Sequence, residues 1–209
     1  MYDPWVDLEA HRLAGWRIRW RRLPGRLGWT HWESSTTYLD PDQDGPQERC
    51  TGAHEVVHIE RGATVVGWEE WEERIVDRIA ARRLITLDDL VEGMLWAYDN
   101  EELAGVLWVD VPTLVTRLQD LTEAEGREVQ RRLDEAEARF PDEIYDDVAW
   151  SEAGFDWQGY PAEPADAAAA DLAPGDYPPI QEPPDDEPPY DDHPYDDQPH
   201  DDYPYEEVP

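Results

Sequence analysis

His54-Glu55-Val56-Val57-His58 lies inside a stretch, residues 46–62, whose apolar side chains recur at helical spacing. Two histidines four positions apart share one face of a helix, so both imidazoles can bind a single Zn²⁺ ion. Glu55 follows the first histidine directly, and from there its carboxylate can act as a general base without binding the metal. We therefore expect a metal-binding helix with His54 and His58 as ligands and Glu55 as the catalytic residue. The alternative is a solvated helix face on which all three are ordinary surface residues.

The residues before this helix predict a small sheet. Residues 16–23 alternate tryptophan and isoleucine with arginine, the period of a half-buried strand, and a Pro-Gly turn follows. Residues 28–31 and 35–39 are typical of two further short strands, and residues 6–13 of a short helix. We expect an antiparallel arrangement of the three strands.

The residues after the histidine helix predict only helices. Their starts carry capping residues, acidic first turns or a first-turn proline. The expected helices run from about 69 to 84, from just after Thr86, from Asn100, from Pro112 to about 121, and from 123 to 139, the last opened by a Thr122–Glu125 capping box. The expected fold class is α+β, a small antiparallel sheet followed by a helical domain.

The charge of the chain is concentrated at one end. Among 209 residues there are 51 acidic and 17 basic side chains, giving a net charge of -34. Residues 141–209 hold 22 of the acids, 14 of the 19 prolines and no arginine. We expect residues 1–140 to form one domain and residues 141–209 a disordered acidic tail. All 17 basic residues are arginine, which excludes a lysine nucleophile and a P-loop lysine.

The single cysteine and the apolar segments indicate a compartment. Cys50 alone cannot form an intramolecular disulfide, the first 14 residues lack a signal-peptide pattern, and no run of about 18 apolar residues is present. We expect a cytoplasmic protein with no membrane association. Cys50 lies one helical turn before His54, but a lone cysteine is more often a small buried apolar residue, and catalysis requires it to stay off the metal.

Several runs together resemble the ImmA/IrrE family of metallopeptidases, of the kind found in phages and mobile elements. The resemblance covers about residues 15–121 and implies a zincin that cleaves a specific protein, a helix-turn-helix transcriptional repressor. The runs that carry it are Trp29-Thr-His-Trp32, Tyr38-Leu39-Asp40-Pro41, and Glu48-Arg49-Cys50-Thr51-Gly52-Ala53 leading into the histidine motif.

The same resemblance implies Glu73, on the next helix, as the third Zn²⁺ ligand. The family pattern continues over residues 73–85 with Val76 for alanine, Asp77 for asparagine and Ile79 for phenylalanine. Helical spacing alone leaves Glu72, Glu69 and Glu70 open as alternatives. The other histidines are weaker candidates: His11, His31, and in the tail His193 and His200.

Residues 102–118 resemble a helix-turn-helix core, with Ala104 where the helices would cross. Trp108 occupies the turn position usually held by glycine, and Arg117 is the only basic residue of the would-be recognition helix. Because duplex DNA requires several phosphate contacts, we expect a protein-packing unit and no direct DNA binding.

Two functions from different classes follow. The first is a zinc metallo-endopeptidase. The alternative is a non-enzymatic anti-repressor or DNA mimic, in which the acidic pairs of the tail present phosphate-like charge to a basic protein.

Overall fold

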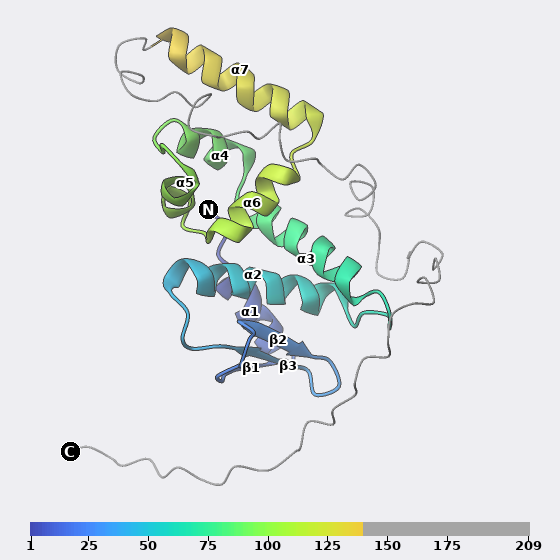
Figure 1. The fold of residues 1–209 in the computed structure, drawn as a ribbon. Helices are drawn as coiled ribbons and strands as arrows, with labels where there is room; N and C mark the ends of the chain where they lie inside the picture. The colour runs from blue at the N-terminus through green and yellow to red at the C-terminus, as the bar shows by residue number, and fades with distance from the viewer. Residues whose placement is uncertain (140–209) are drawn as a thin grey trace, which may run out of the picture. The chain divides into compact units, whose positions relative to one another are not determined.

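The computed structural model describes residues 1–139 as an α+β arrangement of three short strands and seven helices (Figure 1). The expected α+β class and the order of the elements are confirmed, and two helices, α3 and α7, have the expected bounds. The elements are α1 (Pro4–Leu13), β1 (Arg17–Trp20), β2 (Gly28–His31), β3 (Thr36–Leu39), α2 (Gly45–Arg61), α3 (Glu69–Leu84), α4 (Leu87–Met94), α5 (Asn100–Leu107), α6 (Val111–Gln119) and α7 (Glu123–Arg139).

The sheet is mixed, so the expectation of an antiparallel sheet was wrong. Its strand order is β1-β3-β2; β2 and β3 form an antiparallel pair, whereas β1 runs parallel to β3. Trp20 at the end of β1 and Gly28 at the start of β2 both lie beside Leu39. The chain does reverse between β1 and β2, but β3 occupies the space between them and pairs with both. Alternation within each strand does not reveal such an insertion.

Helix α2 lies between the sheet and helices α3 to α7, whereas α1 lies on the sheet side (Figure 1). On the sheet side, Val56 and Ile59 pack with Leu39 and with Leu8 of α1. On the opposite side, the helix joins the larger core through Cys50, Ala53 and Val57, against Val76 and Ala80 of α3. Apolar burial on two sides fixes the rotation of α2 about its axis, and therefore the direction of its histidines.

A buried arginine fastens α2 to the ends of three other segments. Arg49 is 2% exposed, and its guanidinium donates to the carbonyls of Tyr2, Leu84, Leu107 and Trp108. Leu84 and Leu107 are the last residues of α3 and α5, where helix carbonyls lack intrahelical partners and favour a cation. Burial lowers the pKa of Arg49, and nearby acidic groups oppose that shift.

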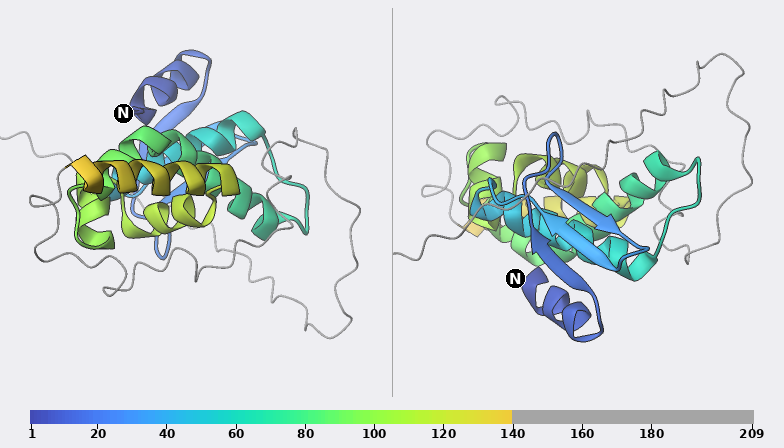
Figure 2. Two further views of the ribbon diagram at one scale, coloured as in Figure 1. Left: turned by 90° about the horizontal axis from the view of Figure 1, so that it is seen from above. Right: turned by 90° about the horizontal axis from the view of Figure 1, so that it is seen from below.

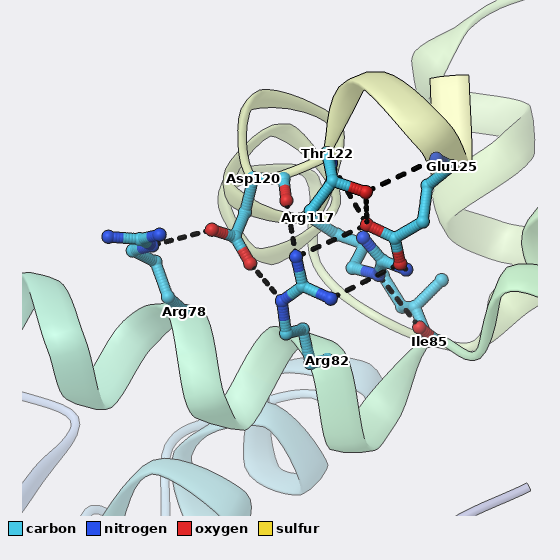
Figure 3. A network of polar contacts seen from close by, with 7 residues as sticks. All are labelled: Arg78, Arg82, Ile85, Arg117, Asp120, Thr122 and Glu125. Atoms are coloured by element: carbon cyan, nitrogen blue, oxygen red, sulfur yellow. Dashed lines mark hydrogen bonds and ion pairs between the residues drawn. The ribbon is translucent and has the colours of Figure 1, made fainter. Parts of the chain in front are cut away.

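The outer face of α3 is joined to α6 and α7 by a network of ion pairs (Figure 3). Asp120, which is buried, accepts from Arg78 at 2.6 Å and also from Arg82. Glu125 accepts from Arg82 and from Arg117, whose Nε donates to the carbonyl of Ile85. The capping box predicted for α7 is present, because Glu125 N donates to Thr122 Oγ1 and Thr122 N donates to Glu125 Oε2.

The segment that resembles a helix-turn-helix is formed by α5 and α6. Trp108 adopts a left-handed conformation with φ 54°, the conformation that glycine supplies at such turns. Its ring lies against Gly45, with the Arg49 guanidinium 5.8 Å from the ring centroid. Arg117, the one base of the second helix, is 2% exposed and is held inside the network described above.

The expected acidic tail lies outside the described residues. Within residues 1–139, no helix combines the length and the apolar character that crossing a membrane requires.

Candidate metal centre

The two histidines of α2 meet on the side of the helix that faces α3. Asp44 caps the helix by accepting from Gln47 N, Pro46 occupies its first turn, and Gly62 ends it with φ 88°. The four-residue spacing brings His54 Nε2 and His58 Nε2 to 3.0 Å from each other. A stable, capped helix therefore aims two imidazole nitrogens at one point.

Glu73 of α3 brings a carboxylate to the same point. Its Oε2 lies 3.2 Å from His54 Nε2, and its Oε1 lies 3.3 Å from His58 Nε2. Four ligands in a tetrahedron around Zn²⁺, at bond lengths of about 2.0–2.1 Å, stand about 3.3 Å from one another. These three residues form a group whose ligand atoms all lie within 4.8 Å of one another, and the group fits a metal ion.

Asp77, one turn after Glu73, orients the first histidine. Its Oδ1 lies 2.9 Å from His54 Nδ1. Since a carboxylate accepts, the ring donates from Nδ1, which leaves Nε2, directed at Glu73 and His58, as the nitrogen that can bind a metal in place of its proton. A carboxylate on the far nitrogen of a metal-binding histidine fixes the ring and increases its basicity.

His58 lacks such a partner. Its Nδ1 is buried without a hydrogen-bond partner among the described residues, as is Nε1 of Trp32. The two rings meet edge to face, with centroids 5.8 Å apart. His58 is therefore positioned by packing, in contrast to His54.

Hydrogen bonds within the centre shift the pKa values of His54 and Glu73. Burial lowers the pKa of His54, but hydrogen bonds to Asp77 and Glu73 outweigh it and raise that pKa to about 10. Burial also raises the pKa of Glu73, but hydrogen bonds from the two histidines more than reverse this, so the pKa falls well below its ordinary value. Both shifts have the same cause: carboxylates and imidazoles converge on one point, where positive charge on the rings and negative charge on Glu73 stabilise each other.

Glu55 points from α2 toward the sheet and lines the same pocket as His54. It is 3% exposed, and its Oε2 accepts from Thr30 Oγ1 at 2.6 Å. Thr30 in turn lies 3.0 Å from Thr37 Oγ1, so two buried hydroxyls support the carboxylate. A Cβ at Gly28 would stand 2.3 Å from Glu55 Oε1, so only glycine leaves room for this carboxylate. Burial raises the pKa of Glu55, with His54 and Thr30 opposing the shift.

A pocket of about 300 Å³ opens beside these residues. His54, Glu55 and Asp77 line one part of it. The side chain of Glu73, which is 53% exposed, leaves the centre open to solvent. The rest of the lining comes from the start of β2 and from α2, α3 and α6: Leu27, Gly28, Cys50, Thr51, Ala80, Asp110, Pro112, Thr113 and Thr116.

The structure places the other candidates away from the centre. Glu72 is 1% exposed and pairs with Arg61 of α2, while Glu69 accepts from the backbone of Gly67. Glu70 is exposed and pairs with Arg74. These three alternatives for the third ligand are therefore engaged elsewhere, and Glu73 is the glutamate that reaches both histidines.

Cys50 and the remaining histidines of the described part also stay apart from the group. Cys50 Sγ accepts from Asp110 N at 3.4 Å, and burial raises the pKa of its thiol to about 11. His31 contacts Ser34 and the ring of Trp29, and His11 lies on α1. His193 and His200 lie outside the described residues.

Sequence reasoning missed the residues that support the centre. The sequence pattern marks Asp77 only as a substitution, although its four-residue distance from Glu73 places both on one helix face. Thr30 and Gly28 belong to a strand distant in sequence from Glu55, and no local pattern could have paired them with it.

Comparisons of the chain with protein-family models, with curated proteins and with solved structures found no match.

Proposed function

We propose that this chain is a zinc-dependent peptidase, with His54, His58 and Glu73 holding the metal and Glu55 as general base. The observation that carries the proposal is the set of three distances between the ligand atoms of His54, His58 and Glu73, which are 3.0, 3.2 and 3.3 Å. These distances match a tetrahedral zinc site with one position open. A catalytic zinc site has three protein ligands and keeps one position for water or substrate. A structural site would need a fourth protein ligand, and Cys50 is engaged with Asp110.

The residues around the centre have separate tasks in this proposal. Zn²⁺, when bound, supplies Lewis acidity that polarises a peptide carbonyl and lowers the pKa of water in the site. Thr30 holds Oε2 of Glu55, which leaves Oε1 to accept the proton of the attacking water and later to return it to the leaving amine. Asp77 accepts from Nδ1 of His54 and so orients the ring with Nε2 toward the metal.

The substrate follows from the resemblance alone. The ImmA/IrrE likeness points to a helix-turn-helix transcriptional repressor, and we extend the proposal to that class. The anti-repressor alternative rests on residues 141–209, outside the described part, and no described contact favours it.

Metal binding is tested first. The full-length protein should bind about one Zn²⁺, and Glu73→Gln should weaken binding more than about 100-fold, beyond the usual cost of losing a supporting residue. Glu70→Gln and Glu72→Gln change the same charge on the same helix and should keep the metal. Isothermal titration calorimetry with Zn²⁺ measures the affinity of each variant. Retention of full affinity by Glu73→Gln would contradict the ligand assignment.

Hydrolysis is tested separately with Glu55→Gln, whose amide can still accept from Thr30 but cannot take a proton from water. We expect zinc binding to persist and cleavage to fall by about 10²- to 10⁴-fold. Incubating each protein with a peptide library from a whole proteome and identifying new ends by mass spectrometry measures the difference. If the wild type creates no ends that Glu55→Gln lacks, the peptidase proposal is wrong even though zinc binds.

A further inference from the structure

The outer face of the sheet is a second surface with a distinct chemistry. Residues of the inner face, including Thr30 and Leu39, contact α2. The alternate residues point the other way, and in the view from below no described helix lies over the strands (Figure 2, right). The strand register places Arg19, Tyr38 and Trp29 in one row across this face, one residue from each strand.

Aromatic rings form the centre of this face. Trp29 and Tyr38 stack with ring centroids 5.5 Å apart and an interplanar angle of 21°. His31 meets Trp29 edge to face at 5.3 Å. Trp29 is 39% exposed although it belongs to a sheet, so part of a large flat ring remains accessible. Exposed rings on a sheet are surfaces on which unpaired bases stack.

Arginines surround these rings in an otherwise acidic chain. Residues 15–39 contain five arginines and one acid, against the net charge of -34 for the whole chain. Arg22 pairs with Asp42, and Arg17 donates to Thr36 and to a backbone carbonyl. Arg19, Arg21 and Arg26 have no side-chain hydrogen bond or ion pair within residues 1–139. Most other described arginines pair with a carboxylate, so this is where cationic groups are left for a ligand.

We propose that the outer face of the sheet binds a short segment of single-stranded nucleic acid. Bases stack on Trp29 and Tyr38, and phosphates pair with Arg19 and Arg21. Three strands about 4.8 Å apart give room for about two or three stacked nucleotides. An acidic polypeptide would use the arginines but leave the ring faces without partners, and a duplex hides its base faces. The sequence predicts no direct DNA binding because a duplex needs several phosphate contacts, and the present proposal departs from that prediction for single strands only. The surface lies on the opposite side of the sheet from Glu55.

The test uses the full-length protein with fluorescein-labelled oligothymidylate and oligouridylate of about ten nucleotides. Fluorescence anisotropy at low ionic strength should show binding that weakens as salt is added, because the arginines release counterions from the phosphates that they neutralise. Binding of either strand supports the proposal, and the preferred one tells whether the ligand is DNA or RNA. Absence of binding by both overturns it.

Variants separate the surface from general charge effects. Arg19→Gln with Arg21→Gln should weaken binding at least tenfold and flatten the logarithmic salt slope by about 1.4, or about 0.7 for each phosphate that an arginine no longer neutralises. Arg127→Gln with Arg131→Gln removes the same charge from exposed positions of α7 and should change affinity less than about twofold. Equal weakening by both pairs would overturn the assignment.

The aromatic contribution is tested with Trp29→Leu, which should weaken binding about tenfold. Tyr38→Leu provides the same test from the neighbouring strand, and thermal unfolding shows whether each variant is folded. If polyglutamate of equal length competes as well as the oligonucleotide, and folded Trp29→Leu and Tyr38→Leu bind like the wild type, the occupant is an acidic polypeptide and the proposal is wrong. A matched duplex that binds as tightly as the single strand overturns it too.

Discussion

The two charged faces of α3 both bring carboxylates together with nitrogen bases, but only one face is balanced by the chain itself. Toward α6 and α7, Arg78 and Arg82 meet Asp120 and Glu125, so each carboxylate receives guanidinium donors (Figure 3). Toward α2, the carboxylates of Glu73 and Asp77 meet the imidazoles of His54 and His58. The two rings have too few N–H groups to donate to all the oxygen and nitrogen lone pairs that converge there. On the first face, paired opposite charges hold α3 to α6 and α7. On the second, several hydrogen-bond acceptors converge on one point, which favours binding of a cation.

The face of α3 toward α6 and α7, called here the closed face, should contribute more to the unfolding free energy than the face toward α2, the open face. Asp120→Ala removes the buried acceptor that Arg78 and Arg82 share. Because these guanidiniums are 17% and 36% exposed, the expected loss of unfolding free energy is that of a charged hydrogen bond, about 1.5–3 kcal/mol. Urea unfolding of the metal-free protein measures this loss. Zinc affinity, measured on the folded variant, should stay within about twofold, because Asp120 touches neither histidine. A joint loss of stability and zinc affinity would mean that the two faces are coupled through α3.

How much could be predicted from the sequence differs between these faces. The 3.6-residue period fixes where His54 and His58 lie relative to each other, so spacing alone predicts the pair. Adjacent glutamates point about 100° apart on a helix, and spacing could not choose between Glu72 and Glu73. The contacts of α3 determine which glutamate faces the histidines: Val76 and Ala80 pack on α2, and Glu72 pairs with Arg61. Such tertiary contacts, like the insertion of β3 into the sheet, leave no local pattern.

The open face should dominate metal affinity. Asp77→Ala removes the acceptor that orients His54, and loss of such a supporting carboxylate weakens zinc binding by about 10- to 100-fold. Asp77→Asn keeps an acceptor oxygen and should recover most of the affinity. Because Asp77 is 51% exposed, solvent screens its pairing with His54, and unfolding of the metal-free protein should change by less than about 1 kcal/mol. An equal loss in both variants would show that the negative charge matters more than the orientation of the ring.

The smallest expected effect concerns pH and the closed face. Burial raises the pKa of Glu125, but the hydrogen bond from Thr122 N and the charge of Arg117 outweigh it and lower the pKa to about 2. Because the folded pKa lies below the unfolded value of 4.5, the stabilisation is complete above about pH 4.5 and is lost as the pH falls through about 2. Glu125→Gln keeps the capping box, since glutamine serves there as well as glutamate, but it removes the titration.

We therefore expect the wild type to lose about 1–2 kcal/mol more unfolding free energy than Glu125→Gln between about pH 6 and pH 2. The figure is set below the full value of the pKa shift because the side chain is 20% exposed and solvent screens part of the pairing. Urea unfolding of both proteins at several pH values measures the difference, and the many other carboxylates of the chain cancel in the comparison. Parallel curves would mean that Arg82 and Arg117 are held mainly by Asp120 and the carbonyl of Ile85. The balance of this face would then depend on one carboxylate, and the contrast with the metal centre would rest on Asp120 alone.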